Sequence, residues 1–231
     1  MIKEILKKFF PGLVEMRNRM INDRKHRGFR NQPIEQVFQA IYRDNHWHDR
    51  ESVSGPGSTV QITSSIRTAI PHIVTKYEIK TFLDIPCGDF NWMRQVHFEN
   101  VKYIGMDIVK EIVQKNTEKY SDTDRSFDFG DITASEIPQS DLIFCRDCLV
   151  HLCYNDIHKA IANMKRSGSR YILTTTFSRK TNYDIVTGDW RPINLCAAPF
   201  NWPEPMEIVS ENEKGDNQDK AMGLWRLSDL T

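Results

Sequence analysis

The feature that most constrains the fold is an alternation of short apolar segments with helical ones, which begins near residue 80. The expected strands lie at 80–84, 101–107, 126–129, 141–145 and 171–177. The expected helices between them lie at 91–96, 109–119 and 155–166. Short apolar strands that alternate with helices can be buried on both faces, so the pattern predicts an α/β fold with a parallel sheet covered by helices. Two further strand-like runs, at 206–210 and 221–227, flank a polar stretch and predict a terminal antiparallel hairpin.

The first sixty residues do not follow this alternation. Helices are expected at 2–10, at 13–25 and from Pro33 onward, and the glycine- and serine-rich stretch that ends at Ser58 is expected to be a loop. We therefore predict an N-terminal helical appendage with a loop, residues 1–60, ahead of one main domain at residues 61–231. A further helix near the start of that domain should kink or restart at Pro71.

Composition limits the class of protein. The chain has 231 residues, 39% of them hydrophobic, and a formal net charge of zero, so it can bury one core and lacks the basic surface typical of nucleic-acid binding. No apolar run approaches the roughly 20 residues of a membrane span, and we expect a soluble cytoplasmic protein. Basic residues gather near the start and acidic ones near the end; we interpret both as solvated faces, with weak peripheral membrane contact as the alternative.

The five cysteines are expected to be free thiols, because their number is odd and they lie in apolar stretches. Cys145 and Cys148 have the C-x-x-C spacing of zinc ligands, but no second pair follows. A closed structural zinc site needs four ligands, so we expect no metal.

The most informative segment is TFLDIPCGDF, residues 81–90, where an apolar strand runs into a turn at Gly88. In an open α/β sheet, ligands bind at the carboxyl ends of the strands. The turn has one glycine and begins with Asp84, so it fits a pyrophosphate poorly. Asp84 and Asp89 instead suit the cationic amino group and sulfonium of S-adenosylmethionine, which is the predicted cofactor.

Two later strand ends support this prediction. Asp107 ends the second strand about twenty residues on, where a carboxylate can accept both hydroxyls of a ribose. Asp131 follows the third strand and can accept from an adenine amino group, with Ile108 and Ile132 as apolar plates for the ring. The order and spacing of these acids after Asp84 argue against coincidence.

On these residues the chain resembles the class I S-adenosylmethionine-dependent methyltransferases. Their first motif commonly reads D-x-G-x-G-x-G, which this sequence matches at Asp84 and Gly88 and departs from at Pro86 and Phe90. The two departures leave the cofactor pose open, because Pro86 restricts the backbone and Phe90 adds bulk near the methionine moiety. The resemblance implies a Rossmann-like sheet of seven strands that ends in a reversed hairpin.

Further motifs resemble methyltransferases found among bacterial genes for capsule and lipopolysaccharide decoration. They are SVSGPGS at 52–58, DIPCGDFNW at 84–92, PFNWPEP at 199–205 and LWRL at 224–227. This resemblance implies O-methylation of a sugar hydroxyl or of a phosphate-like substituent such as phosphoramidate, and it implies that the 54–58 loop folds over the cofactor with Trp47 as a wall. The predicted cofactor-binding residues are Trp47, Ser54, Gly55, Asp84, Pro86, Gly88, Asp89, Asp107, Ile108, Asp131, Ile132 and Arg146.

The predicted catalytic residues follow the fourth strand. Asp147 and His151 are placed at the pocket rim, where a base within reach of an acceptor hydroxyl contributes typically 10²–10⁴-fold. They are four residues apart, so on a helix they would share one face and could act as a base and its orienting partner. The alternatives are a helix cap for Asp147 and a core histidine for His151.

Together with the N-terminal helices, the long connection at 178–205 is a candidate acceptor lid, because loops of this length are uncommon unless they form part of a site. Tyr183, Trp190 and Arg191 are its predicted substrate-binding residues. Trp190 can stack on a sugar face and Arg191 can pair with a phosphate, or both can simply anchor the loop.

Two other functions compete with a methyltransferase. One is a non-catalytic cofactor-binding partner in a glycan assembly, against which Asp147 and His151 argue mildly. The other is a nicotinamide-dependent oxidoreductase, which the missing glycines disfavour. The sequence leaves open the acceptor, the choice between oxygen and nitrogen, any need for a metal and the oligomeric state.

Overall fold

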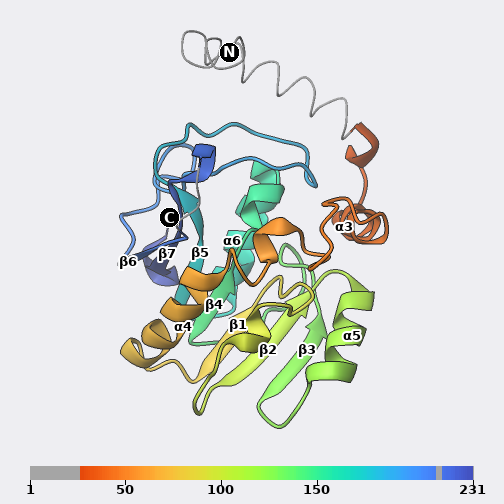
Figure 1. The fold of residues 1–231 in the computed structure, drawn as a ribbon. Coiled ribbons are helices and arrows are strands. Elements are labelled where there is room, and N and C mark those ends of the chain that lie inside the picture. Colours follow the sequence, from red (N-terminus) through yellow and green to blue (C-terminus); the bar gives the residue numbers. More distant parts are fainter. Residues whose placement is uncertain (1–26, 212–214, 231) are drawn as a thin grey trace.

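The computed structural model describes residues 27–211 and 215–230, so the helices expected at 2–10 and 13–25 lie outside the described residues. Within them one sheet of seven strands has the order β3-β2-β1-β4-β5-β7-β6 (Figure 1). The strands are β1 Thr81–Asp84, β2 Lys102–Asp107, β3 Arg125–Phe129, β4 Leu142–Cys145, β5 Tyr171–Phe177, β6 Glu207–Ser210 and β7 Lys220–Arg226. Strands β1 to β5 run parallel, and β7 inserts antiparallel between β5 and β6, which confirms the expected terminal hairpin.

The described helices cover both faces of the sheet. The α-helices are α3 Ile34–Arg43, α4 Ser64–Lys76, α5 Lys110–Tyr120 and α6 Tyr154–Arg166. Short 3-10 turns lie at η1 Arg27–Phe29, η2 Pro56–Ser58, η3 Met93–Gln95, η4 Leu149–His151, η5 Gly215–Asn217 and η6 Leu227–Asp229. No helix in the described part of the chain is long and apolar enough to cross a membrane.

The structure corrects one local expectation and part of another. The helix expected at 91–96 is only the short turn η3. Phe90 and Met93 point into the core there, and the residues that follow do not form an apolar face long enough for a helix. Helix α4 does not restart at Pro71 but continues through it. Buried Ile66 and Ile73 lie on either side of the proline, so packing holds the helix together where proline alone would end it.

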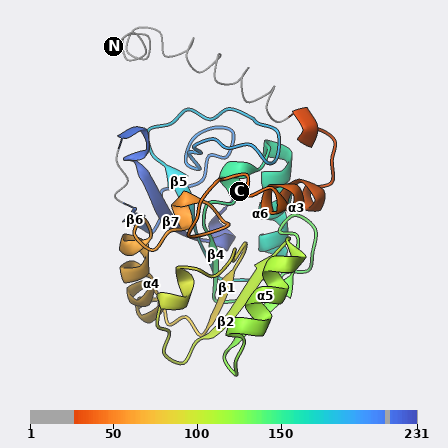
Figure 2. The same ribbon diagram turned by 45° about the vertical axis from the view of Figure 1, so that its right-hand side comes forward.

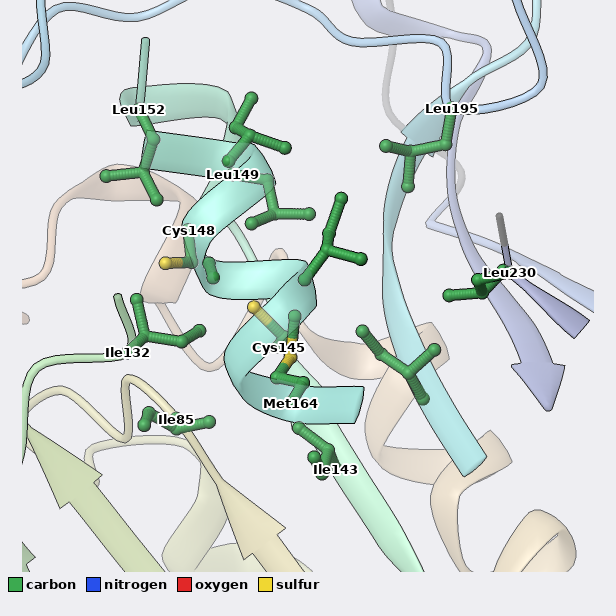
Figure 3. Packing of buried hydrophobic residues seen from close by; sticks show 14 of the residues in the cluster. Ile85, Ile132, Ile143, Cys145, Cys148, Leu149, Leu152, Met164, Leu195 and Leu230 are labelled. Carbon is green, nitrogen blue, oxygen red and sulfur yellow. The ribbon is translucent and has the colours of Figure 1, made fainter. Parts of the chain in front are cut away.

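Alternate strand residues feed two separate cores. Leu83 and Ile172 belong to the cluster beneath α6, whereas Phe82 and Leu173 belong to the cluster beneath α4. Figure 3 shows part of the first cluster, in which the strand β4, the turn η4 and helix α6 pack together. A sheet that is apolar on both faces must be covered on both, as the continuous apolar strands predict.

The carboxyl ends of the parallel strands form one edge. Asp84, the last residue of β1, is in register with Gly105 of β2 and Phe144 of β4. Helix α3 and the connection from β5 to β6 lie over this same edge (Figures 1 and 2). Functional side chains at the strand ends therefore face a space roofed by segments from both halves of the sequence.

Candidate functional site

A pocket at this edge is lined by the strand ends, by α3 and by the loop that precedes α4. Every predicted cofactor-binding residue except Gly55 lines it, and so do Asp147 and His151. Gly55 lies directly behind the wall, with a positive φ of 95° and a position where a Cβ atom would come within 3.1 Å of Trp47 Cβ. The strand-end geometry thus brings together residues that are far apart in the sequence.

Asp84 and Asp107 lie side by side at the base of the pocket, both almost completely buried. The Tyr103 hydroxyl donates to Asp84 Oδ2 at 2.6 Å, and burial raises the pKa of Asp84 to about 8. Burial also raises the pKa of Asp107, to about 6. The Gly88 and Val109 amides donate to its two oxygens at 3.0 and 2.9 Å. Each carboxylate oxygen of Asp107 keeps a second lone pair, which fits it to accept two ribose hydroxyls.

The turn after β1 depends on Gly88. Its φ is 56°, in the left-handed region, and a Cβ atom there would stand 2.4 Å from Ser54 Oγ. Both the conformation and the close approach therefore require glycine. Pro86 lines the pocket, but Phe90 does not. The ring of Phe90 packs against Tyr103 and Phe127 in the core beneath the turn, so the expectation that Phe90 crowds the methionine moiety was wrong.

Asp89 makes loop contacts that the sequence prediction did not include. Its carboxylate accepts from Ser52 Oγ at 3.0 Å and from the Val53 amide at 2.9 Å, and its own amide donates to Ser54 Oγ at 3.3 Å. Asp89 lines the pocket, but its charge is used to fasten the Ser52–Ser54 loop to the turn after β1. The residue predicted to lie near a cation therefore also anchors a loop that lines the pocket.

Asp131 lies at the far end of the pocket, beyond β3. Its Oδ1 accepts from both the amide and the hydroxyl of Thr133 at 2.7 Å. Among the described residues its Oδ2 has no hydrogen-bond partner, so this oxygen is the one available to an adenine amino group. Ile108 and Ile132 line the same part of the pocket, as expected of apolar plates.

Asp147 and His151 do not form the predicted pair of base and orienting partner. Asp147 precedes the turn η4 and has a positive φ of 50°. Lys220 Nζ donates to its Oδ2 at 2.8 Å. The partner of His151 is the Asp189 backbone carbonyl, 2.8 Å from Nδ1. A carbonyl can only accept, so Nδ1 carries the proton and Nε2 keeps a lone pair. The ring of His151 lies 4.8 Å from that of Trp47, centroid to centroid.

The two residues also differ in their protonation. Burial alone would raise the pKa of Asp147, but the charges of Lys220 and Arg146 hold it well below its usual range. Burial lowers the pKa of His151 to about 4. At neutral pH the pocket therefore presents an ionised, ion-paired carboxylate and a neutral imidazole.

Comparison with known proteins agrees with this geometry. Residues 82–168 match the methyltransferase domain family, which covers β1 to the end of α6. The fold is that of the class I methyltransferases. The domain match and this fold support S-adenosylmethionine as the cofactor of the pocket. No curated protein sequence matches the chain.

Three solved structures illustrate the shared methyltransferase fold. Human N-acetylserotonin methyltransferase in complex with S-adenosylmethionine is 15% identical, with a TM-score of 0.56 over 89% of this chain and 66% of its own. The N-methyltransferase NodS of Bradyrhizobium japonicum is 13% identical, with a TM-score of 0.55 over 72% and 96%. Magnesium protoporphyrin IX methyltransferase of Synechocystis with bound S-adenosylmethionine is 10% identical, with a TM-score of 0.54 over 85% and 98%.

Two arginines among the predicted site residues are held by buried partners within the chain. Arg146 lines the pocket, but its buried guanidinium is held by Glu211. Arg191 is fully buried and donates to the carbonyls of Leu149 and Leu152, each at 2.8 Å. It fastens the β5–β6 connection to the turn η4, and it has no exposed surface to offer a phosphate.

The other two predicted substrate residues are outside the pocket lining. Trp190 packs edge-on against Phe177, with ring centroids 6.3 Å apart, and the Tyr183 carbonyl accepts from Arg191. Both are only partly buried. These contacts favour the alternative in which Trp190 and Arg191 anchor the connection and do not bind substrate.

Sequence reasoning missed the contribution of α3. Four of its residues line the pocket: Ile34, Phe38, Ile41 and Tyr42. Their spacing was recognised as an apolar helix face, but nothing in a spacing distinguishes a face on a core from a face over a pocket. Surface pairs hold α3 to α5, among them Lys110 with Glu35 at 2.8 Å and Gln39 with Glu111 at 2.7 Å.

Proposed function

We propose that the chain is an S-adenosylmethionine-dependent methyltransferase that methylates a hydroxyl oxygen, with His151 as the base. The observation that supports this best is the convergence of Asp84, Asp107 and Asp131 from three successive strand ends on one pocket. When bound, S-adenosylmethionine supplies a methyl group activated by its sulfonium. Asp107 would accept the ribose hydroxyls, and Asp131 Oδ2 would accept from the adenine amino group.

His151 is better suited than Asp147 to accept the acceptor proton. Its Nδ1–H is fixed by the Asp189 carbonyl, so the neutral ring offers Nε2 as the proton acceptor. As the new O–C bond forms and the C–S bond breaks, the hydroxyl proton would pass to Nε2. A pKa of about 4 makes His151 a modest base, so alignment of the acceptor must contribute much of the acceleration.

We propose a neutral sugar hydroxyl as the acceptor, in surface-polysaccharide biosynthesis. The motifs at 52–58 and 84–92 support this class of pathway through their resemblance to decoration enzymes. A phosphate-like acceptor such as phosphoramidate is less favoured, because Arg191 is buried and Arg146 is already paired with Glu211.

We also propose that residues 34–58 act with the main domain as a cover for the cofactor. Trp47, Ser54 and four side chains of α3 line the pocket from this side. The division of the chain at residue 60 would then separate two parts of one binding site.

The decisive experiment combines calorimetry with an assay for S-adenosylhomocysteine. Wild-type protein is titrated with S-adenosylmethionine and with NAD, then incubated with S-adenosylmethionine and a panel of neutral and phosphorylated sugars. We expect S-adenosylmethionine to bind and NAD not to bind. Turnover should be confined to neutral sugars.

Two variants separate binding from catalysis. Asp107→Ala should weaken S-adenosylmethionine binding at least tenfold, because it removes both ribose acceptors. His151→Gln should bind the cofactor normally and lose most turnover. A wild-type protein without heat from S-adenosylmethionine would refute the proposal, and full turnover in His151→Gln would refute the role of His151.

A further inference from the structure

Four charged side chains form a buried cluster where the terminal hairpin meets the pocket. Arg146 and Asp147 come from the end of β4, Glu211 follows β6, and Lys220 begins β7. Lys220 Nζ lies 2.8 Å from Asp147 Oδ2 and 3.5 Å from Glu211 Oε2. Arg146 contacts both carboxylates, with Nη1 3.3 Å from Asp147 Oδ2 and Nε 3.2 Å from Glu211 Oε1. Two cations and two anions make the cluster neutral.

Within the cluster, the carboxylate of Asp147, four residues before His151, is held by ion pairs. Asp147 Oδ2 is shared by Lys220 and Arg146, and the Thr175 hydroxyl lies 3.4 Å from Oδ1. Both oxygens of Asp147 are thus directed to the hairpin side of the pocket. His151 is left with the Asp189 carbonyl as its hydrogen-bond partner.

We propose that Lys220 is a positioning residue of the methyl-transfer site. By holding the Asp147 carboxylate in the buried cluster, it keeps that carboxylate from turning to His151, so that Nε2 of the neutral ring stays free to accept a proton from the acceptor. Without Lys220 the cluster would carry a net negative charge, and the released Asp147 carboxylate would raise the pKa of His151. The inference rests on the proposed role of His151 and adds a hairpin residue that acts on it through Asp147.

The charges that face these groups agree with the proposal. Burial is the main cause of the low pKa of His151, and nearby Arg191 and Lys220 lower it as well, whereas the Asp189 carbonyl and Asp147 act to raise it. Burial would lower the pKa of Lys220, as does Arg146, but Asp147 and Glu211 raise it above its usual value. Removal of Lys220 would therefore leave the influence of Asp147 on His151 opposed by burial and by Arg191.

The test is an NMR titration of the His151 ring in the full chain, with the His151→Gln spectrum identifying its signal. In Lys220→Met we expect the pKa of His151 to rise by at least one unit. In Lys220→Arg it should stay within half a unit of wild type. In the double variant Lys220→Met with Asp147→Asn it should return to the wild-type value. An unchanged pKa in folded Lys220→Met would overturn the proposal.

Two further measurements keep the outcome clear. Lys76→Met removes an exposed lysine at the end of α4 that pairs with Glu207 of the same hairpin, and it should leave the His151 titration unchanged. If Lys220→Met does not fold, Asp147→Asn alone decides, because the proposal expects it to lower the pKa of His151, and a rise would contradict it. Calorimetry with S-adenosylmethionine on the same variants tests the proposed function separately, since cofactor binding does not depend on the His151 titration.

Discussion

Burial sets the chemistry of single residues in this pocket. Asp84 sits almost fully out of water with one hydroxyl donor, from Tyr103, and its pKa is raised to about 8. Asp107 accepts hydrogen bonds from two backbone amides, which oppose the effect of burial, so its pKa rises only to about 6. Two neighbouring acids of the same type therefore differ in charge at neutral pH, with Asp84 mostly protonated and Asp107 mostly ionised.

We predict that S-adenosylmethionine binding at pH 7 releases a proton from Asp84. The cationic amino group and sulfonium favour the ionised carboxyl, so its pKa should fall when the cofactor arrives. Calorimetry in phosphate and in Tris at the same pH should give binding enthalpies that differ by the ionisation enthalpies of the buffers. Asp84→Asn should remove the difference. Equal enthalpies in the two buffers for the wild type would contradict the assignment.

Asp84 should also make stability depend on pH. Its pKa is about 8 in the folded chain against an ordinary value of 3.8, so between these values the folded state holds a proton that the unfolded chain has released. The free energy of unfolding should therefore fall as pH rises from 4 to 8, by on the order of a few kcal/mol. Denaturant unfolding at pH 5 and pH 8 should show a smaller decrease in Asp84→Asn. A decrease of the same size in both proteins would rule out Asp84 as its source.

At the scale of elements, the loop before α4 joins the two halves of the site. Asp89 fastens it at Ser52 and Val53, beside the turn after β1. Farther along the loop, a Cβ atom at Gly57 would lie 3.3 Å from Asp147 Oδ2. The loop thus extends from the cofactor turn to the proposed acceptor side, and its placement should affect how long the cofactor stays bound.

We predict that Asp89→Ala weakens S-adenosylmethionine binding about tenfold, mainly through faster dissociation. The variant loses hydrogen bonds to a charged acceptor, each typically worth about 1.5–3 kcal/mol, so the loop spends less time closed. Stopped-flow measurement of dissociation tests this, and hydrogen exchange at the Val53 amide should accelerate.

Asp122→Ala is the matched control for this prediction. Asp122 accepts from the Asp124 amide at 3.0 Å in the turn between α5 and β3, and it does not line the pocket. Its removal should leave cofactor dissociation unchanged. If Asp89→Ala binds the cofactor as wild type does, the loop does not cover the site in solution.

The strands and the acidic residues at their ends could be predicted from local sequence, but the hydrogen-bond and ion-pair partners of those residues could not. Asp107 and Asp131 could be placed because a strand end is a local feature with a fixed position in a parallel sheet. The contacts of Asp89 and Arg191 could not be predicted, because their partners are backbone groups of distant segments, which reach them only in the folded chain. Asp147 shows the same limit, because the spacing to His151 suggested a pair that Lys220, 73 residues away, prevents.

At the scale of the whole molecule, the hairpin connects the end of the chain to the centre of the sheet. The acidic run near the end was interpreted as a solvated face, and for Glu211 this was wrong: the residue is 3% exposed. It holds Arg146 at the end of β4, across 65 residues of sequence. Glu207, on the same hairpin, follows the expectation better, since it pairs with the exposed Lys76.

This contrast predicts unequal effects for two identical substitutions. Glu211→Gln leaves the buried Arg146 without its carboxylate and should reduce the free energy of unfolding by about 3 kcal/mol or more. In a chain of this size that corresponds to a fall in Tm of roughly 6–12 °C. Glu207→Gln loses the charge that pairs with the exposed Lys76 but keeps an acceptor for the Tyr77 hydroxyl, and it should cost about 0–1 kcal/mol. Thermal and denaturant unfolding of both variants checks this, and equal losses would mean that the buried cluster does not couple the hairpin to β4. A large loss confined to Glu211→Gln would instead establish that the acidic end of the chain stabilises the pocket edge from within the core.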